Sequence, residues 1–176
     1  MAGRAVGRPD PDEYDPFYAD YVARVTEDDP IEAMATQIGQ TTALLERVAE
    51  EDAGKRYAMG KWSVKEVVGH LTDAERIFSY RALRIARGDD TPLPGFDENA
   101  YVPAGRFAER TLRELGGELA NARRSTLDLF RSFDGAAWRC RGVASGNPIS
   151  VRALACIIPG HERHHVEVLR TRYGLR

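Results

Sequence analysis

The chain has 176 residues and a formal net charge of -2 at neutral pH. This length suits one domain whose hydrophobic core is large enough to fold without disulfide or metal cross-links. Hydrophobic residues make up 43% and charged residues 30%, which is usual for globular proteins and excludes the disordered and fibrous classes. Without an excess of positive charge, nucleic acid is not expected as a partner.

Nothing in the sequence predicts a leader or a membrane span. The first 16 residues lack the apolar stretch of a secretory leader, and no segment approaches the ~18 apolar residues that a membrane span needs. Cys140 and Cys156 stand apart and have no second pair, so a thiolate zinc motif is not indicated. We expect a cytoplasmic protein that does not bind membranes.

The N-terminal part differs in composition from the rest. Residues 1–16 are rich in Arg, Asp, Pro and Gly and are expected to form a mobile tail. Residues 17–25 carry spaced aromatic and aliphatic side chains, which indicate a short segment that docks onto the body. The predicted division is therefore a tail and docking segment, 1–28, followed by a bundle domain, 29–176.

Apolar residues recur at helical spacing in four stretches, which predicts four amphipathic helices. The predicted ranges are 30–51, 64–87, 112–133 and 151–173. Capping signals mark their starts: Asp29 before Pro30, Ser63 with Glu66, Thr111 with Glu114, and Ser150.

The connections decide how these helices are arranged. Residues 89–109 contain three prolines and two glycines without helical period, and they are long enough to form a crossover. Residues 134–149 are expected to form another loop, and no segment is a convincing strand. The sequence therefore predicts an all-α four-helix bundle with a long crossover between its second and third helices.

The histidines are the main functional signal. Three of the four lie within residues 161–165. At ~100° per residue, His161 and His165 lie one turn apart and differ by ~40° in direction, so both rings can reach one ion. They fall on the apolar face of the fourth helix, and His70 falls on the apolar face of the second. Three inward imidazoles predict a metal site that keeps open positions for water or substrate.

Other interpretations of these residues remain open. A single inward histidine is usually a hydrogen-bonded core residue, and only the set of three favours a metal. His164 is also about one turn from His161, but it points ~60° to the side away from His165, nearer the polar face. Cys156 points to nearly the opposite side of the helix and is excluded as a ligand.

Several motifs together resemble one known family. They are residues 60–71 (GKWSVKEVVGHL), 73–76 (DAER), 80–84 (YRALR), 95–98 (GFDE) and 160–165 (GHERHH). The chain resembles the DinB-like superfamily, and within it the YfiT-like branch of metal-dependent hydrolases and thiol S-transferases.

This resemblance implies a four-helix bundle with a long crossover and a zinc or nickel site. The site's histidines, one on the second helix and an HxxxH pair on the fourth, match His70, His161 and His165. The resemblance also implies frequent homodimers and, in some members, a low-molecular-weight thiol as co-substrate. Pro159 departs from a regular helix beside His161 and is expected to bend it.

Three further residues are candidates for the pocket. Arg81 lies in the inward sector of the second helix and is predicted to bind an anionic part of a small substrate, or to pair with an interior acid such as Glu162. Glu162 and Asp97 are candidate proton-handling groups, although Glu162 could be structural and Asp97 could serve only its turn. Asp73 and Glu66 flank His70 and could support it.

Two functional classes follow. The first is a metal-dependent thiol S-transferase or hydrolase that acts on a small electrophile. The second is a non-enzymatic bundle in which the metal is structural and which binds a small ligand or a partner protein. A catalytic site requires an open coordination position and a pocket, whereas a structural site is closed by four protein ligands.

Overall fold

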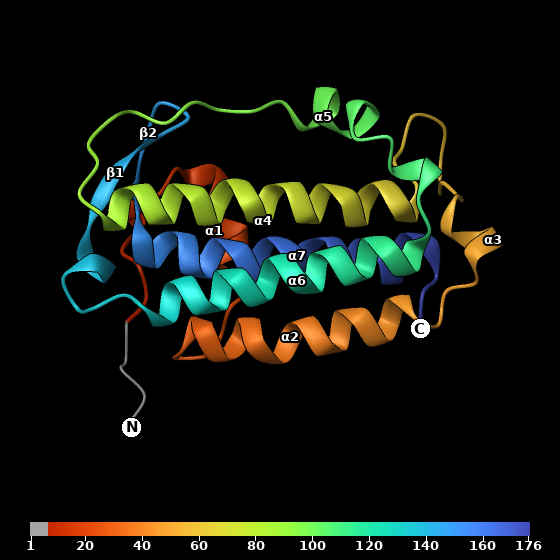
Figure 1. The fold of residues 1–176 in the computed structure, drawn as a ribbon, viewed down its shortest axis with the longest axis horizontal. Helices are drawn as coiled ribbons and strands as arrows, with labels where there is room; N and C mark the ends of the chain where they lie inside the picture. The colour runs from red at the N-terminus through yellow and green to blue at the C-terminus, as the bar shows by residue number, and fades with distance from the viewer. Residues whose placement is uncertain (1–6) are drawn as a thin grey trace.

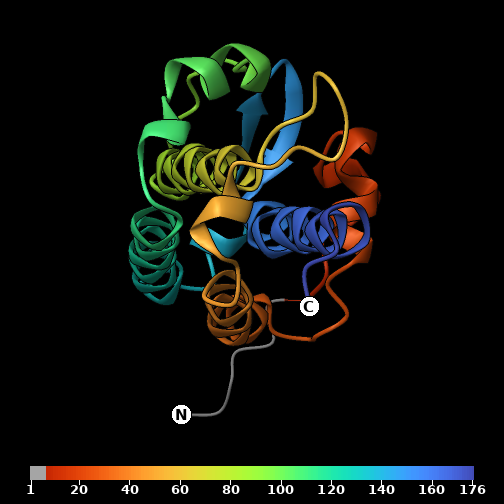
Figure 2. The same cartoon turned by 90° about the vertical axis from the view of Figure 1, so that its right-hand side faces the viewer.

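Four long helices form the body of the protein in a computed structural model that describes residues 7–176 (Figure 1). They are α2 (Pro30–Leu45), α4 (Val64–Ala86), α6 (Leu112–Arg131) and α7 (Val151–Tyr173). Helix α4 packs between α6 and α7, and α2 closes the bundle by packing against the same two helices (Figure 2). Helices α4 and α6 run in the same direction, opposite to α2 and α7. The predicted all-α bundle is confirmed.

Local signals fix where the helices begin. Both predicted capping boxes are present, with Ser63 and Glu66 starting α4 and Thr111 and Glu114 starting α6. The Asp29 side chain accepts a hydrogen bond from the backbone N–H of Ile31 at the start of α2. The first helix ends earlier than predicted, because the backbone turns extended at Ala49 before a separate one-turn helix, α3 (Glu50–Ala53).

The long connection between α4 and α6 contains helix that the sequence did not predict. Helix α5 (Glu98–Ala104) and the 3-10 turn η3 (Phe107–Glu109) lie within it. Two turns are too short for an apolar period to emerge, and Pro103 lies inside the helix. The connection still acts as the expected crossover, since it brings the chain back to start α6 parallel to α4.

A small hairpin follows the 3-10 turn η4 (Ala137–Arg139) and corrects the prediction of a plain loop over residues 134–149. Strand β1 (Arg141–Ala144) pairs antiparallel with β2 (Asn147–Ser150). Ser145 and Gly146 form the two-residue turn, with φ of 54° and 81°. Four-residue strands are too short to give a clear alternating pattern, and Pro148 is unusual in a strand.

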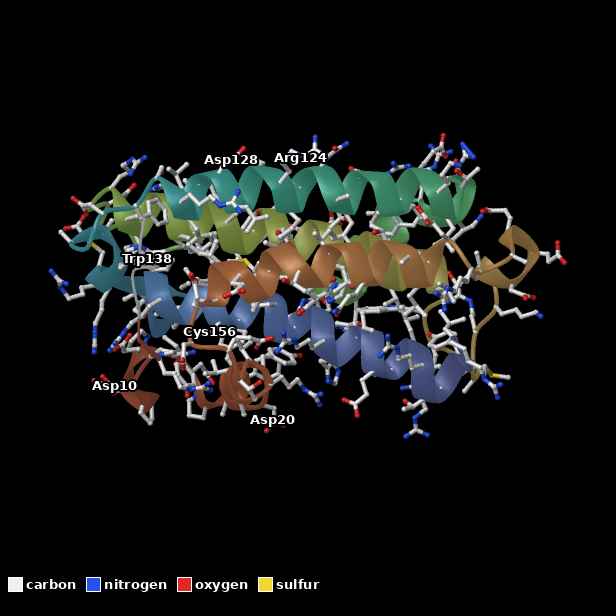
Figure 3. The ribbon with its side chains drawn as sticks, turned by 90° about the horizontal axis from the view of Figure 1, so that it is seen from below. Asp10, Asp20, Arg124, Asp128, Trp138 and Cys156 are labelled. Carbon is white, nitrogen blue, oxygen red and sulfur yellow. The ribbon has the colours of Figure 1, made fainter. Side chains whose placement is uncertain are left out.

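The N-terminal segment packs along α7 (Figure 3). It comprises η1 (Pro11–Glu13), η2 (Pro16–Tyr18) and α1 (Ala19–Ala23). The expectation of a mobile tail is wrong for residues 7–16, because the Glu13 side chain is buried against Arg152 and Ser150. Burial alone would raise the pKa of Glu13, but these hydrogen bonds lower it to about 2. Residues 1–6 lie outside the described part of the chain.

The docking prediction for residues 17–25 agrees with this packing, since Val22 and Val25 are buried. Within residues 7–176, no helix is long and apolar enough to cross a membrane.

Candidate metal centre

Three histidine rings meet where α4 and α7 pack side by side. His70 comes from α4, and His161 and His165 come from successive turns of α7. The Nε2 atom of His161 lies 3.0 Å from Nε2 of His70 and 3.1 Å from Nε2 of His165. His70 is 6% exposed and His161 7%, so these two rings are buried in the bundle, and His165 is half-buried.

Helix α7 keeps its two histidines in register despite Pro159. The helix continues from Val151 to Tyr173 without interruption. The side chain of Gln37, from α2, donates a hydrogen bond of 3.1 Å to the carbonyl oxygen of Pro159. The uninterrupted helix accommodates the proline, and His161 and His165 both face His70.

The donor set fits a metal ion. Two nitrogen ligands of a tetrahedral zinc lie about 3.3 Å apart, close to the distances found here. Burial lowers the pKa of His70 to about 4 and that of His165 to about 3, and it lowers the pKa of His161 well below its usual range. The rings are thus neutral near pH 7, the form that binds metals.

Hydrogen bonding alone satisfies this cluster poorly. A neutral imidazole nitrogen either donates one hydrogen or accepts one, so three converging nitrogens cannot all pair well with one another. A single cation at their meeting point would satisfy all three. His70, His161 and His165 are therefore the residues that could hold a metal, and His164 does not belong to this group.

A pocket of about 270 Å³ opens onto the histidines. Six aromatic side chains line it, and in the part of the chain that the structure describes no lysine or arginine does. The Trp62 ring lies 4.8 Å from that of His70, and the Phe78 ring lies 5.8 Å from that of His161. The aromatic lining residues are Phe17, Tyr18, Tyr21, Trp62, Phe78 and Phe96.

The N-terminal segment supplies one side of this pocket. The Tyr21 ring lies 5.4 Å from the His161 ring and 5.5 Å from the His164 ring. Burial raises the pKa of Tyr21, and the nearby Tyr18 and Glu98 raise it further. His164 lines the pocket as well, on the side that faces α1.

A buried ionic network lies beneath the histidines. Arg123, with 0% exposure, donates to both carboxylate oxygens of Glu75, at 2.6 and 2.7 Å, and to Glu162 at 2.7 Å. Thr41 donates to the other oxygen of Glu162. His161, Glu75, Glu162 and Arg123 border one small internal gap. The network joins α4, α6 and α7 at the level of the site.

This network changes the interpretation of Glu162. Its carboxylate is 2% exposed and both oxygens are engaged, so it does not line the pocket and is not available to exchange protons there. The structural alternative for Glu162 matches its position. Its arginine partner is Arg123, not Arg81.

Arg81 and Asp97 also lie outside the pocket wall. Arg81 is 2% exposed and donates to the carbonyl oxygen of Pro94 at 2.8 Å and to Ser145 Oγ at 3.0 Å, which ties the crossover to the hairpin turn. Asp97 is exposed and accepts from the backbone N–H of Asn99 at 2.9 Å, as the N-cap of α5. Neither Asp73 nor Glu66 lines the pocket.

Several lining residues were not predicted from the sequence, and Trp62 and Glu98 are two of them. The Trp62 ring, just before the start of α4, stacks with the His165 ring at a centroid distance of 6.4 Å. Glu98 follows Asp97 and contributes a carboxylate to the pocket wall. A helix start at Asp97 would have been the signal, because a capping aspartate bonds the backbone and leaves the next acid free.

The comparisons with known proteins agree with this fold. The family model of the DinB superfamily matches residues 33–169. The chain therefore belongs to the DinB superfamily, as the motifs around His70 and His161 predicted.

The individual proteins that match the chain have low sequence identity to it. A protein of Oceanobacillus iheyensis named "Putative metal-dependent hydrolase" is 29% identical over 73 residues, which span 41% of this chain and 40% of that protein. YfiT from Bacillus subtilis, described as "a probable metal-dependent hydrolase with an unusual four-helix bundle topology", has a TM-score of 0.75 at 17% identity over 93% of this chain and 95% of its own. The mycothiol-dependent maleylpyruvate isomerase has a TM-score of 0.65 at 13% identity, over 82% of this chain and 61% of its own.

Proposed function

We propose that the chain binds one divalent transition metal, zinc or nickel, through Nε2 of His70, His161 and His165, and that it is a metal-dependent hydrolase or thiol S-transferase. The convergence of the three Nε2 atoms, with neighbouring distances of 3.0 and 3.1 Å, carries this proposal. The names of the structurally similar YfiT and the O. iheyensis protein support it.

The open pocket supports a catalytic role. Three histidines leave a coordination position free, and the 270 Å³ pocket gives a small molecule access to it. When bound, the ion would lower the pKa of a coordinated thiol or water and so supply a nucleophile near neutral pH. The aromatic wall would exclude bulk water and hold the apolar part of a small electrophile.

A low-molecular-weight thiol is the proposed co-substrate of the transferase form. Its support is the fold shared with a mycothiol-dependent isomerase. The alternative is a structural metal in a bundle that binds a ligand without transforming it. The free coordination position and the pocket favour the enzyme.

The test is an activity screen with matched variants. Metal-loaded protein would be assayed against a panel of small electrophiles, with and without low-molecular-weight thiols, beside His165→Ala and His164→Ala. Turnover that is lost in His165→Ala and kept in His164→Ala supports the proposal. Equal turnover in the wild type and His165→Ala would contradict it, and a fourth protein ligand at the ion would favour the structural alternative.

A further inference from the structure

Glu98 places a carboxylate in the pocket wall without a partner. It is half-buried in the first turn of α5 and lines the same pocket as the three histidines. Asp97 caps the helix, so the Glu98 side chain is not needed there. Among residues 7–176, no side chain forms an ion pair or hydrogen bond with it.

The other buried and half-buried glutamates of the described chain differ from Glu98 in their surroundings. Each of them pairs with arginine: Glu13 with Arg152, Glu66 with Arg56, Glu75 and Glu162 with Arg123, and Glu118 with Arg76 and Arg110. A carboxylate removed from water without such a partner costs free energy. Glu98 is therefore a negative charge that is open to a partner from outside the chain.

Aromatic side chains at the mouth of the pocket, which we call the aromatic rim, are likewise open to a partner from outside the chain. Phe17 lines the pocket and is 69% exposed. Phe96 also lines it and packs at 5.5 Å against Tyr101, which is 47% exposed. Exposed aromatic groups at a pocket mouth contribute little to the core, and their ring faces attract cations as well as apolar groups.

Among residues 7–176, no arginine or lysine lines this pocket. The Arg81 guanidinium lies 5.9 Å from the centroid of the Phe78 ring and is directed to Pro94 and Ser145. We infer that the pocket takes a substrate with a cationic, amine-type group next to an apolar or aromatic part. Glu98 and the aromatic rim recognise that group. This inference rests on the proposed function, because it treats the pocket as the substrate site.

Binding of small molecules that are not turned over tests the role of the Glu98 charge apart from any reaction. Benzyltrimethylammonium is a permanent cation with no atom that coordinates a metal, benzyl alcohol is its uncharged counterpart, and benzenesulfonate is the anionic one. Their Kd values would be measured by calorimetry on the protein with and without its metal, and on Glu98→Gln and Glu32→Gln. Glu32 is a matched control, since it is an exposed acid in the first turn of α2, which is also capped by an aspartate.

The wild type and Glu32→Gln should prefer the ammonium probe to the alcohol by about tenfold, and Glu98→Gln should lose most of this preference. A bound divalent ion repels the cation in all three proteins, so the comparison isolates the carboxylate. A preference that Glu98→Gln leaves unchanged, or tighter binding of the sulfonate than of the ammonium by the metal-free protein, would overturn the inference.

The outcome is distinguishable from that of the proposed function. None of the probes is turned over, and the metal content of the same samples is measured separately. If the protein binds metal and has activity but Glu98→Gln keeps the preference for the ammonium probe, only the inferred substrate class is overturned. If the protein lacks metal and activity but its preference for the ammonium probe depends on Glu98, only the metal chemistry is overturned.

Discussion

A β-carbon added to Gly160 would lie 1.9 Å from the carbonyl oxygen of Tyr21, so the backbone of α1 rests directly on α7. This close approach occurs one residue before His161 and places the Tyr21 ring beside it. The N-terminal segment is thus part of the pocket wall, and only glycine permits the contact.

Gly160→Ala should push α1 away from α7. The clash is with backbone atoms, which cannot rotate aside, so the variant should lose about 1–3 kcal/mol of unfolding free energy and expose residues 7–25 to proteases. Urea unfolding and limited proteolysis would measure both effects.

Gly39→Ala is the matched control, because a β-carbon there meets nothing within 4 Å in the middle of α2. It should gain about 0.5–1 kcal/mol. Equal behaviour of the two variants would show that α1 does not rest on α7 as described.

Arg123→Met should be strongly destabilising. It would leave Glu75 and Glu162 buried without their cation, at a cost of about 3–5 kcal/mol in the free energy of unfolding. Arg124→Met changes the neighbouring exposed residue, which points away from the bundle in Figure 3, and should stay within about 0.5 kcal/mol of the wild type. Similar losses in both variants, measured by chemical unfolding, would argue against the buried network.

The metal-free protein should lose stability in acid. Burial lowers the pKa of His70 from 6.5 to about 4, so the unfolded chain binds more protons than the folded one between these values. The contribution of His70 to the unfolding free energy is therefore complete above about pH 6.5 and decreases as the pH falls toward 4. The contribution of His70 amounts to roughly 2 kcal/mol between pH 6.5 and 5.

Urea unfolding of metal-free protein at several pH values would measure this dependence. His70→Gln should have a shallower pH dependence in the same range, because its side chain does not titrate. An identical slope in the variant would show that His70 is not buried in its neutral form.

Much of the architecture could be predicted from sequence because its signals are local. The capping boxes at Ser63 and Thr111 and the apolar periods fixed where α4 and α6 begin. The i, i+4 spacing of His161 and His165 determined that both could face one point. The short elements could not be predicted in this way, since α5 and the hairpin contain too few residues for a period.

The partners and roles of individual charged side chains were harder to predict. Arg81, Arg123 and Glu162 all lie on inward faces, and the sequence does not say which cation meets which acid. Asp97 and Glu98 are adjacent acids, and only the start of α5 decides which one caps the helix and which one lines the pocket. The homodimer remains a prediction, which light scattering at micromolar concentration would check.

Metal analysis of purified protein tests the central claim most directly. Inductively coupled plasma mass spectrometry should find close to one transition metal per chain in the wild type and in His164→Ala, and almost none in His70→Ala or His161→Ala. Circular dichroism would confirm that each variant is folded. Full metal content in folded His161→Ala, or its loss in His164→Ala alone, would contradict the assignment of His70, His161 and His165 as the metal ligands.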